Sequence, residues 1–320
     1  MFSYRHAFHA GNHADVLKHT ALIAVLRHMT QKDTALNVFD THAGAGLYRL
    51  DGDYAQTSGE AADGYLRLIS KQNEAQALLK QAQSATKSVA TKKPEAAPLP
   101  AALQDYLDIV ASFNKGVSHT VYPGSPFIIH SLLQGRDRDR LKLFELHPTD
   151  AKTLRANIAQ LDAGRLITVH QEDSFEGLKK FLPPPSRRAL VLCDPSYELK
   201  TDYARVLDMM TDAVKRFATG TYMVWYPIIP RPEAHDLPRR LKTLAVREGR
   251  PWLNASLTVK SSKLTTDAEG EVVRPGLPAS GVFVINPPHT LKAALKDALG
   301  AAAKLLAQDK NQGFEVESGG

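Results

Sequence analysis

Residues 35–46, ALNVFDTHAGAG, join a short apolar run to a turn that contains two glycines. Such a run is typical of a buried strand, and glycines allow a tight turn in which a ligand approaches bare backbone. A nicotinamide dinucleotide site needs a third glycine three positions on and an acid about 20 residues later. Position 49 is Arg49, and an insertion displaces the equivalent acid. This stretch therefore predicts the first strand of a nucleotide-binding α/β fold and disfavours NAD as its ligand.

Short apolar runs and longer helical patterns alternate along most of the chain, as in a parallel sheet covered by helices. In residues 149–161, for example, Leu154, Ile158 and Leu161 recur at i, i+4 and i+7 and form one apolar stripe. We expect seven strands, at residues 35–40, 141–146, 166–170, 189–193, 221–226, 254–259 and 281–285. Helices are expected at residues 14–29, 149–161, 175–181, 202–217 and 233–246. The predicted fold is Rossmann-like, with a seven-stranded, mostly parallel sheet and helices on both faces.

Residues 48–115 interrupt this alternation, because they are rich in Ala, Gln and Lys and contain no convincing strand. We expect a small helical subdomain here, inserted after the first strand, with a flexible loop near residues 82–102. The main domain would then comprise residues 1–47 and 116–290. Residues 291–320 are expected to form a C-terminal helix and a frayed tail.

The composition is that of an ordinary globular protein, with 43% hydrophobic and 23% charged residues. A net charge of +6 favours polyanionic partners such as nucleic acid. The single cysteine, Cys193, cannot form an intrachain disulfide, which fits a reducing compartment. The first 19 residues contain no apolar run, so no secretory signal is expected, and no apolar stretch reaches the ~18 residues of a membrane span. We therefore expect a cytoplasmic protein with no membrane partner.

Acidic residues follow the second and third predicted strands. Glu145 closes the second strand and could accept both hydroxyls of a ribose, and Asp173, after the third strand, could reach an adenine amino group. Either acid alone could instead be a surface or helix-capping residue. Because the carboxyl ends of parallel strands meet at one edge of a sheet, we expect these acids near Gly44 and Gly46, around one ligand site.

The apolar strand at residues 189–193 ends in the tetrapeptide DPSY, Asp194 to Tyr197. An adenine amino nitrogen is a weak nucleophile, because its lone pair is delocalised into the ring. The Asp194 carboxylate and the main-chain carbonyl of Pro195 could each accept one amino hydrogen and favour a pyramidal nitrogen in the transition state. Tyr197 could stack on the extruded base. A strand-terminating turn with a packed tyrosine is the alternative, but the expected place beside the glycine turn favours catalysis.

Together these motifs resemble class I methyltransferases that modify exocyclic amino groups, and most closely the RlmJ family, which methylates an adenine of large-subunit ribosomal RNA. The resemblance lies in YRHAFHAGNHADVLKH at residues 4–19, DTHAGAG at 40–46, YPGSP at 122–126, ELHP at 145–148 and DPSYEL at 194–199. It covers most of the chain outside the insertion and the tail. It implies a class I methyltransferase fold, S-adenosylmethionine as the cofactor, the N6 amino group of an adenine in 23S ribosomal RNA as the acceptor, and no metal. We expect a monomer.

The resemblance also implies roles for individual residues. Asp194 would accept the target amine, with Pro195 and Tyr197 beside it, and Tyr4 and Lys18 would contact RNA. The family has a second proline where this chain has Ser196, which loosens the turn, but the carbonyl needed for the amine belongs to the retained Pro195. The insertion is longer than the family's helical subdomain. The cofactor pocket would be lined by His19, His42, Gly44, Gly46, Ser125, Glu145, Asp173, Ser174 and Asp194.

Other functions remain open at this stage. The amine-binding motif serves adenine in DNA as well as in RNA, and it can serve cytosine. A non-catalytic RNA-binding module would need the basic surface, with runs at residues 136–142 and 239–240, but no cofactor pocket. The four histidines of the first 19 residues, with Asp40 and Asp194, make a metal-dependent hydrolase a formal alternative, although no carboxylate follows them in a hydrolase spacing.

Overall fold

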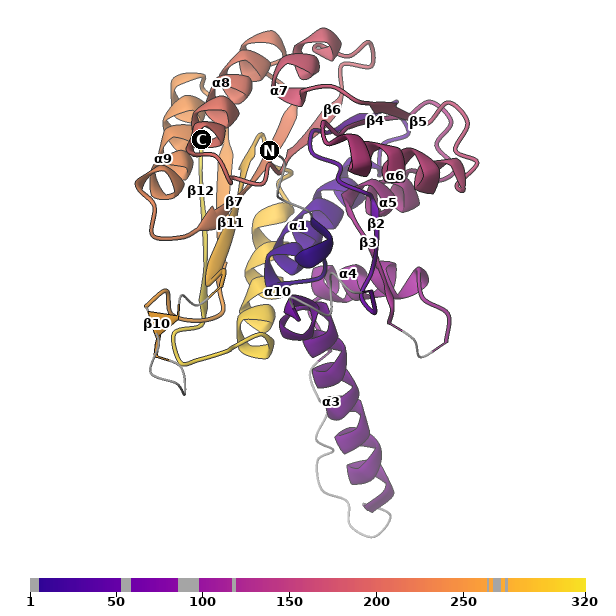
Figure 1. Ribbon diagram of the computed structural model, residues 1–320, viewed down its shortest axis with the longest axis vertical. Coiled ribbons are helices and arrows are strands. Elements are labelled where there is room, and N and C mark those ends of the chain that lie inside the picture. Colours follow the sequence, from indigo (N-terminus) through magenta and orange to yellow (C-terminus); the bar gives the residue numbers. More distant parts are fainter. Residues whose placement is uncertain are drawn as a thin grey trace.

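The strand before the glycine turn lies inside an eight-stranded sheet (Figure 1). The computed structural model describes residues 6–52, 59–85, 98–116, 119–263, 265–266, 272–273 and 276–320. In order across the sheet, the strands are β12 (Gly313–Gly319), β8 (Trp252–Thr258), β11 (Ala279–Ile285), β7 (Thr221–Ile228), β6 (Ala189–Cys193), β1 (Asn37–Asp40), β4 (Arg140–Phe144) and β5 (Ile167–His170). The five strands from β5 to β7 are mutually parallel, and β11 is antiparallel to β7 and β8. The predicted Rossmann-like, mostly parallel fold is confirmed.

The prediction of seven strands and a frayed tail is wrong at the carboxyl terminus. Residues Gly313–Gly319 form β12, which pairs antiparallel with the whole of β8. In this segment Phe314 and Val316 alternate with glutamates, the period of two that is typical of a strand with one covered face. The alternation is too short to identify a strand by itself. The open edge of β8 supplies the backbone hydrogen-bond partners that order it.

Two hydrophobic cores cover the two faces of the sheet, as the alternation within β6 illustrates. Leu190 and Leu192 point into one core, and Val191 and Cys193 point into the other. The first core is covered by α1 (His13–Met29), α5 (Ser125–Leu133), α6 (Pro148–Ala159) and α10 (Leu291–Leu305). The second is covered by η3 (Leu178–Phe181), α8 (Lys200–Arg216) and α9 (Pro232–Arg247). Because β6 is buried on both sides, its sequence is a continuous apolar run.

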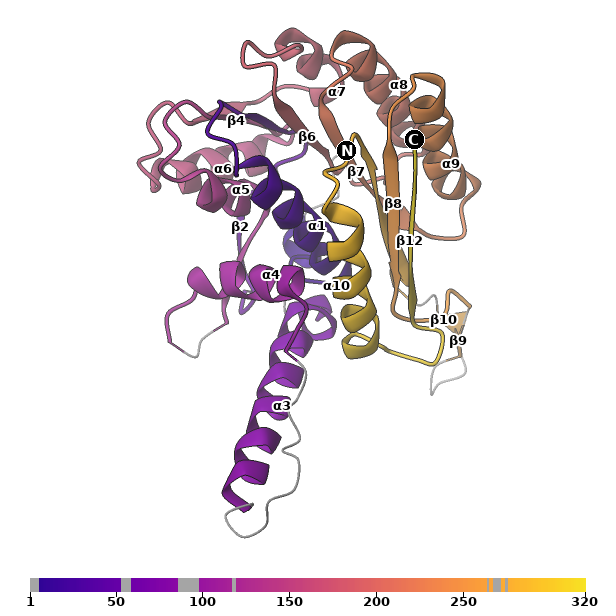
Figure 2. The same ribbon diagram turned by 180° about the vertical axis from the view of Figure 1, so that it is seen from behind.

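The segment expected as a helical insertion, residues 48–115, begins within β2 (Leu47–Arg49), which was not expected, and ends before β3 (Val121–Pro123); β2 and β3 pair as antiparallel strands. It contains η2 (Glu60–Asp63), α3 (Tyr65–Ala85) and α4 (Ala101–Ser112). Helix α4 packs against α1 and α10, whereas α3 projects away from the sheet (Figures 1 and 2). The loop expected near residues 82–102 overlaps the ends of α3 and α4, and its residues 86–97 lie outside the described residues.

The order of the strands across the sheet indicates where a ligand site lies. Strand β1 lies between β4 and β6, and the chain continues outward in opposite directions from these two neighbours. In open parallel sheets, ligands bind at such a reversal, beyond the carboxyl ends of the strands. The remaining described elements are short: η1 (His6–Phe8), α7 (Ser174–Gly177), and the pair β9 (Thr265–Thr266) and β10 (Val272–Val273). Among the described residues, no helix is both long enough and apolar enough to cross a membrane.

Candidate active site

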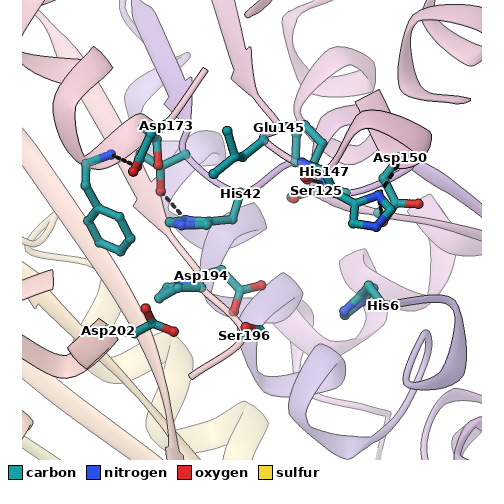
Figure 3. A pocket seen from close by; sticks show the side chains of 18 of the residues that line it. His6, His42, Ser125, Glu145, His147, Asp150, Asp173, Asp194, Ser196 and Asp202 are labelled. Atoms are coloured by element: carbon teal, nitrogen blue, oxygen red, sulfur yellow. Dashed lines mark hydrogen bonds and ion pairs between the residues drawn. The ribbon is translucent and has the colours of Figure 1, made fainter. Parts of the chain in front are cut away.

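A cavity of about 330 Å³ opens where β1, β4, β5 and β6 end (Figure 3). We call it the first cavity. Its wall contains Gly44 from the loop after β1 and Asp194 from the loop after β6, so these two sequence motifs share one site as predicted. Of the residues expected to bind cofactor or substrate, ten line this cavity: Lys18, His19, His42, Gly44, Ser125, Glu145, Asp173, Ser174, Asp194 and Pro195.

The two glycines of the turn serve different purposes. Both have a positive φ, 60° at Gly44 and 79° at Gly46, which favours glycine. A Cβ atom at Gly44 would collide with the Tyr48 hydroxyl at the cavity wall. A Cβ atom at Gly46 would lie 2.8 Å from Cδ1 of Leu154 in α6. Gly46 is not among the residues that line the cavity, so its observed role is close packing of the turn rather than cofactor contact.

Glu145 is held in the first cavity by main-chain amides from two loops. The Gly44 amide donates to Oε2 over 2.8 Å, and the His147 amide donates to Oε1 over 2.7 Å. Burial raises the pKa of Glu145, while these hydrogen bonds oppose the increase. Each carboxylate oxygen has a second lone pair, so Glu145 can still accept hydrogens from the two hydroxyls of a ribose.

Asp173 both caps helix α7 and lines the first cavity. As the N-cap of α7 it accepts a hydrogen bond from the Phe175 amide over 3.0 Å. Its other oxygen accepts one from Arg205 of α8 over 2.5 Å, and that guanidinium lies 4.1 Å from the centroid of the Phe175 ring. Sequence reasoning missed Arg205, because nothing in its own helix marks it as the partner of a residue 32 positions earlier.

Two histidines, one buried and one half-buried, contribute neutral imidazole rings to the first cavity. Burial lowers the pKa of both His19 and His42 to about 3. His42 Nδ1 lies 2.8 Å from the Thr41 hydroxyl, and His19 Nδ1 lies 2.8 Å from the Tyr122 hydroxyl. His19 Nε2 is buried and has no hydrogen-bond partner within the described residues. Since an unsatisfied buried nitrogen is costly, a polar group of a bound ligand would stabilise this wall.

The first cavity is acidic, although the whole chain has a net charge of +6. Both basic side chains in its wall, Lys18 and Arg205, already pair with acids. The excess of carboxylates favours a positively charged ligand, as a sulfonium cofactor is. The carboxylates that line the cavity belong to Glu145, Asp150, Glu172, Asp173, Asp194, Glu198 and Asp202.

Asp194 is held by a buried cation. Lys18 Nζ lies 2.5 Å from Oδ2 of Asp194 and 2.8 Å from Oδ1 of Asp15. Asp15 also accepts a hydrogen bond from the Gly11 amide and lies 3.0 Å from the His6 ring. Burial alone would lower the pKa of Lys18, but the two carboxylates raise it, so the lysine stays charged. The pKa of Asp15 is low despite its burial, because His6 and Lys18 favour its carboxylate form.

Two residues expected to contact RNA, Lys18 and Tyr197, are almost fully buried. Lys18 is 4% exposed and bound to two carboxylates, which contradicts a contact with phosphate. Tyr197 is 2% exposed, its hydroxyl donates to the Trp225 carbonyl over 2.7 Å, and its ring centroid lies 4.6 Å from that of Tyr203. These contacts anchor a turn whose φ at Tyr197 is 53°, and they leave Tyr197 in the wall of a second cavity described below. Tyr4 lies outside the described residues.

A second cavity, of about 350 Å³, adjoins the first at Asp194. Four residues line both cavities: His6, Lys18, Asp194 and Ser196. Much of the remaining wall is apolar and comes from the carboxyl end of β7 and the loop after it: Trp225, Pro227 and Ile229, with Arg231 beyond them. The sequence did not reveal this cavity, because its walls come from segments that lie far apart along the chain.

The histidines of the amino-terminal segment have separate partners. His6 contacts Asp15, His9 Nδ1 lies 3.0 Å from Glu60, and His13 Nε2 lies 2.9 Å from the Leu277 carbonyl. In the described part of the chain, no three or more His, Cys, Asp or Glu side chains are grouped to hold a metal ion. These separate contacts explain the histidines without a common ligand.

A parallel sheet in this order, a glycine turn after its first strand and acids at the ends of the next two define a class I methyltransferase. A family model described as "Ribosomal RNA large subunit methyltransferase D, RlmJ" matches residues 33–93 and 79–317. Ribosomal RNA large subunit methyltransferase J of Escherichia coli is 38% identical over 299 residues, which cover 93% of this chain and 92% of that protein. The protein of the same name from Haemophilus influenzae is 35% identical, with 99% and 98% covered. The chain therefore belongs to the RlmJ family.

A solved structure agrees with this assignment. The crystal structure of a protein from Legionella pneumophila has a TM-score of 0.76 and 27% sequence identity to this chain, and it covers 97% of this chain and 98% of that one. The similarity thus extends over nearly the whole chain and is not confined to the central sheet.

Proposed function

We propose that this chain transfers the methyl group of S-adenosylmethionine to the N6 amino group of an adenine in 23S ribosomal RNA. The observation that carries the proposal is the position of Asp194 in the walls of both cavities. The acidic first cavity suits the cofactor, and the more apolar second cavity suits a base turned out of the RNA. Donor and acceptor would therefore meet beside Asp194. Membership of the RlmJ family supports ribosomal RNA as the substrate.

On the cofactor side, we assign Glu145 to the ribose hydroxyls and Asp173, with Ser174, to the adenine of the cofactor. Both carboxylates are oriented by main-chain amides, so little ordering is left to occur on binding. His19 would offer its unpartnered Nε2 to a polar group of the cofactor, with Ser125 and His42 in the same wall. When bound, S-adenosylmethionine supplies an activated methyl group on a positively charged sulfur.

On the acceptor side, the Asp194 carboxylate and the Pro195 carbonyl would each accept one hydrogen of the adenine amine. These bonds localise the nitrogen lone pair, and the Asp194 carboxylate can take the surplus proton after transfer. Lys18 fixes the direction of Asp194, and Asp15 balances part of the charge of Lys18, so that Asp194 stays a strong acceptor. Lys18 is in this account a positioning residue.

The second cavity offers a further aromatic side chain, beside Tyr197, for stacking on the base. Trp225 and Tyr197 both line this cavity, and the Trp225 side chain is half-buried whereas Tyr197 is almost fully buried. A base between Trp225 and Ile229 would bury its flat faces against apolar side chains. We also propose that the enzyme works in the cytoplasm as a monomer, which sedimentation of the purified chain would check.

The proposal is tested by methylation of RNA from cells that lack the protein. The purified chain and labelled S-adenosylmethionine should yield N6-methyladenosine in 23S ribosomal RNA, identified by mass spectrometry of the labelled nucleoside. The Asp194→Ala variant serves as the inactive control. Labelled methyl groups in DNA, or on cytosine, would instead support DNA or cytosine as the substrate. Binding of RNA without any transfer, and without binding of S-adenosylhomocysteine, would indicate a non-catalytic module.

A further inference from the structure

With Lys18 buried, the phosphate contact that an RNA substrate requires must lie elsewhere. Arg231 lines the second cavity, in the loop between β7 and α9. Strand β7 is parallel to β6, so this loop and the Asp194 turn lie at the same edge of the sheet. The side chain of Arg231 is half-buried and thus reaches both the cavity and solvent.

The charge of Arg231 is not balanced by a bonded carboxylate. Its guanidinium donates to the Tyr197 carbonyl over 3.3 Å, and no ion pair joins it to an acid in the described part of the chain. The acid nearest in sequence, Glu233, lies 3.8 Å from Lys200 instead. Other basic groups of the second cavity are paired, since Lys18 and His6 contact Asp15 and His9 contacts Glu60.

An arginine in this position suits an anion beside the base. A guanidinium has five donors in a planar fork, and the contacts of Arg231 with the Tyr197 carbonyl and the Tyr203 side chain leave others available for phosphate oxygens. When the amine of an adenine in the second cavity reaches Asp194, the sugar and phosphate of that nucleotide lie toward the mouth of the cavity. Arg231 also touches the turn itself through the carbonyl of Tyr197, so its position is fixed relative to Asp194.

We propose that Arg231 binds a phosphate group of the acceptor nucleotide. The inference rests on the proposed function, since it identifies the second cavity as the acceptor site. It assigns the phosphate contact to a residue of the second cavity that no sequence motif marks.

The probes are adenosine and adenosine monophosphates with the phosphate on the 5′ or the 3′ oxygen. Their binding to the full chain saturated with S-adenosylhomocysteine is measured by calorimetry. For the unaltered chain, we expect at least one monophosphate to bind about tenfold more tightly than adenosine. Arg231→Gln, which retains a donor for the Tyr197 carbonyl, should abolish this ratio, and Arg231→Lys should retain part of it.

The matched control is Arg240→Ala, an exposed arginine on α9 outside both cavities. It removes one positive charge and should leave the ratio unchanged. An unaltered chain that does not discriminate between adenosine and the monophosphates, or an Arg231→Gln variant that keeps the ratio, would overturn the inference. A variant that merely loosens the turn would weaken adenosine and monophosphate equally, and so would also keep the ratio. Failure of the proposed function is a separate result, namely no transfer to RNA by the unaltered chain.

Discussion

The two cavities on either side of Asp194 are built in different ways. In the first cavity, Glu145 is oriented by the main-chain amides of His147 and of Gly44 in the glycine turn. Asp173 is oriented by the main-chain amide of Phe175, two residues further along the chain. In the second, the important groups are held by side chains far away in the sequence, as Lys18 holds Asp194 across 176 positions. The cofactor side is therefore a property of local loops on a common sheet edge, and the acceptor side is a property of the assembled tertiary structure.

Removing the group shared by the two cavities should have the largest effect. We expect Asp194→Ala to lower kcat by about 100-fold or more, because it removes an acceptor that acts on the reacting amine. Affinity for S-adenosylhomocysteine should fall much less, since Glu145 and Asp173 remain. Single-turnover methylation and calorimetry measure the two effects. The exposed Asp208→Ala is the control, and near-normal turnover of Asp194→Ala would remove Asp194 from the mechanism.

A change confined to the first cavity should separate the two sides. Glu145→Gln keeps the size of the side chain but removes the charge that accepts the Gly44 and His147 amides and, in our assignment, the ribose hydroxyls. We expect affinity for S-adenosylhomocysteine to fall by about 10- to 100-fold, with RNA affinity unchanged. The exposed Glu176→Gln on α7 is the matched control. Equal losses of cofactor and RNA affinity would mean that the cavities are not independent.

A change behind the second cavity tests whether Lys18 acts through Asp194. In Asp15→Asn the side-chain oxygen can still accept a hydrogen bond from the Gly11 amide. The ammonium of Lys18 then pairs with Asp194 as its one remaining carboxylate, which makes Asp194 a weaker acceptor for the amine. We expect kcat to fall about tenfold with the KM for S-adenosylmethionine unchanged. A loss of thermal stability that accounts for all of the lost activity would instead assign Asp15 a structural role only.

The smallest effect concerns the histidines of the first cavity. The pKa of His42 is about 3 in the fold and about 6.5 in an unfolded chain, so the unfolded state binds more protons between these values. The free energy of unfolding should therefore decrease as the pH falls from about 6.5 toward 3. We expect His42→Gln to reduce this slope by up to about 1.4 kcal/mol per pH unit.

Urea unfolding at several pH values measures this slope. Burial raises the pKa of Asp40 to about 6, so the folded state binds more protons at this site than the unfolded state does. Asp40 therefore contributes a slope of the opposite sign. This contribution is the same in the unaltered chain and in His42→Gln, so it cancels when the two slopes are compared. The exposed His235→Gln should leave the slope unchanged. An unaltered slope in His42→Gln would show that His42 takes up its proton without unfolding the chain.

The sequence predicted the fold and the first cavity well for a physical reason. Strand β6 was predicted with its observed bounds, because burial on both faces requires a continuous apolar run. Parallel strands then bring their carboxyl ends together, so residues such as Gly44, Glu145 and Asp173 converge without any knowledge of side-chain packing. The error at Gly46 has the opposite origin, since a turn motif does not reveal which of its residues face a cavity and which pack against the core.

The sequence by itself determined the alternation of strands and helices in the main domain, the site at the carboxyl edge and the chemistry available to Asp194, because each depends on local periodicity and on residues next to a strand end. Only the tertiary structure decided that Lys18 is a buried partner of Asp194, that β12 completes the sheet and that Trp225 and Arg231 line a second cavity. These features depend on pairing between distant segments, and the free energy of such contacts comes from burial and charge neutralisation that no single segment contains.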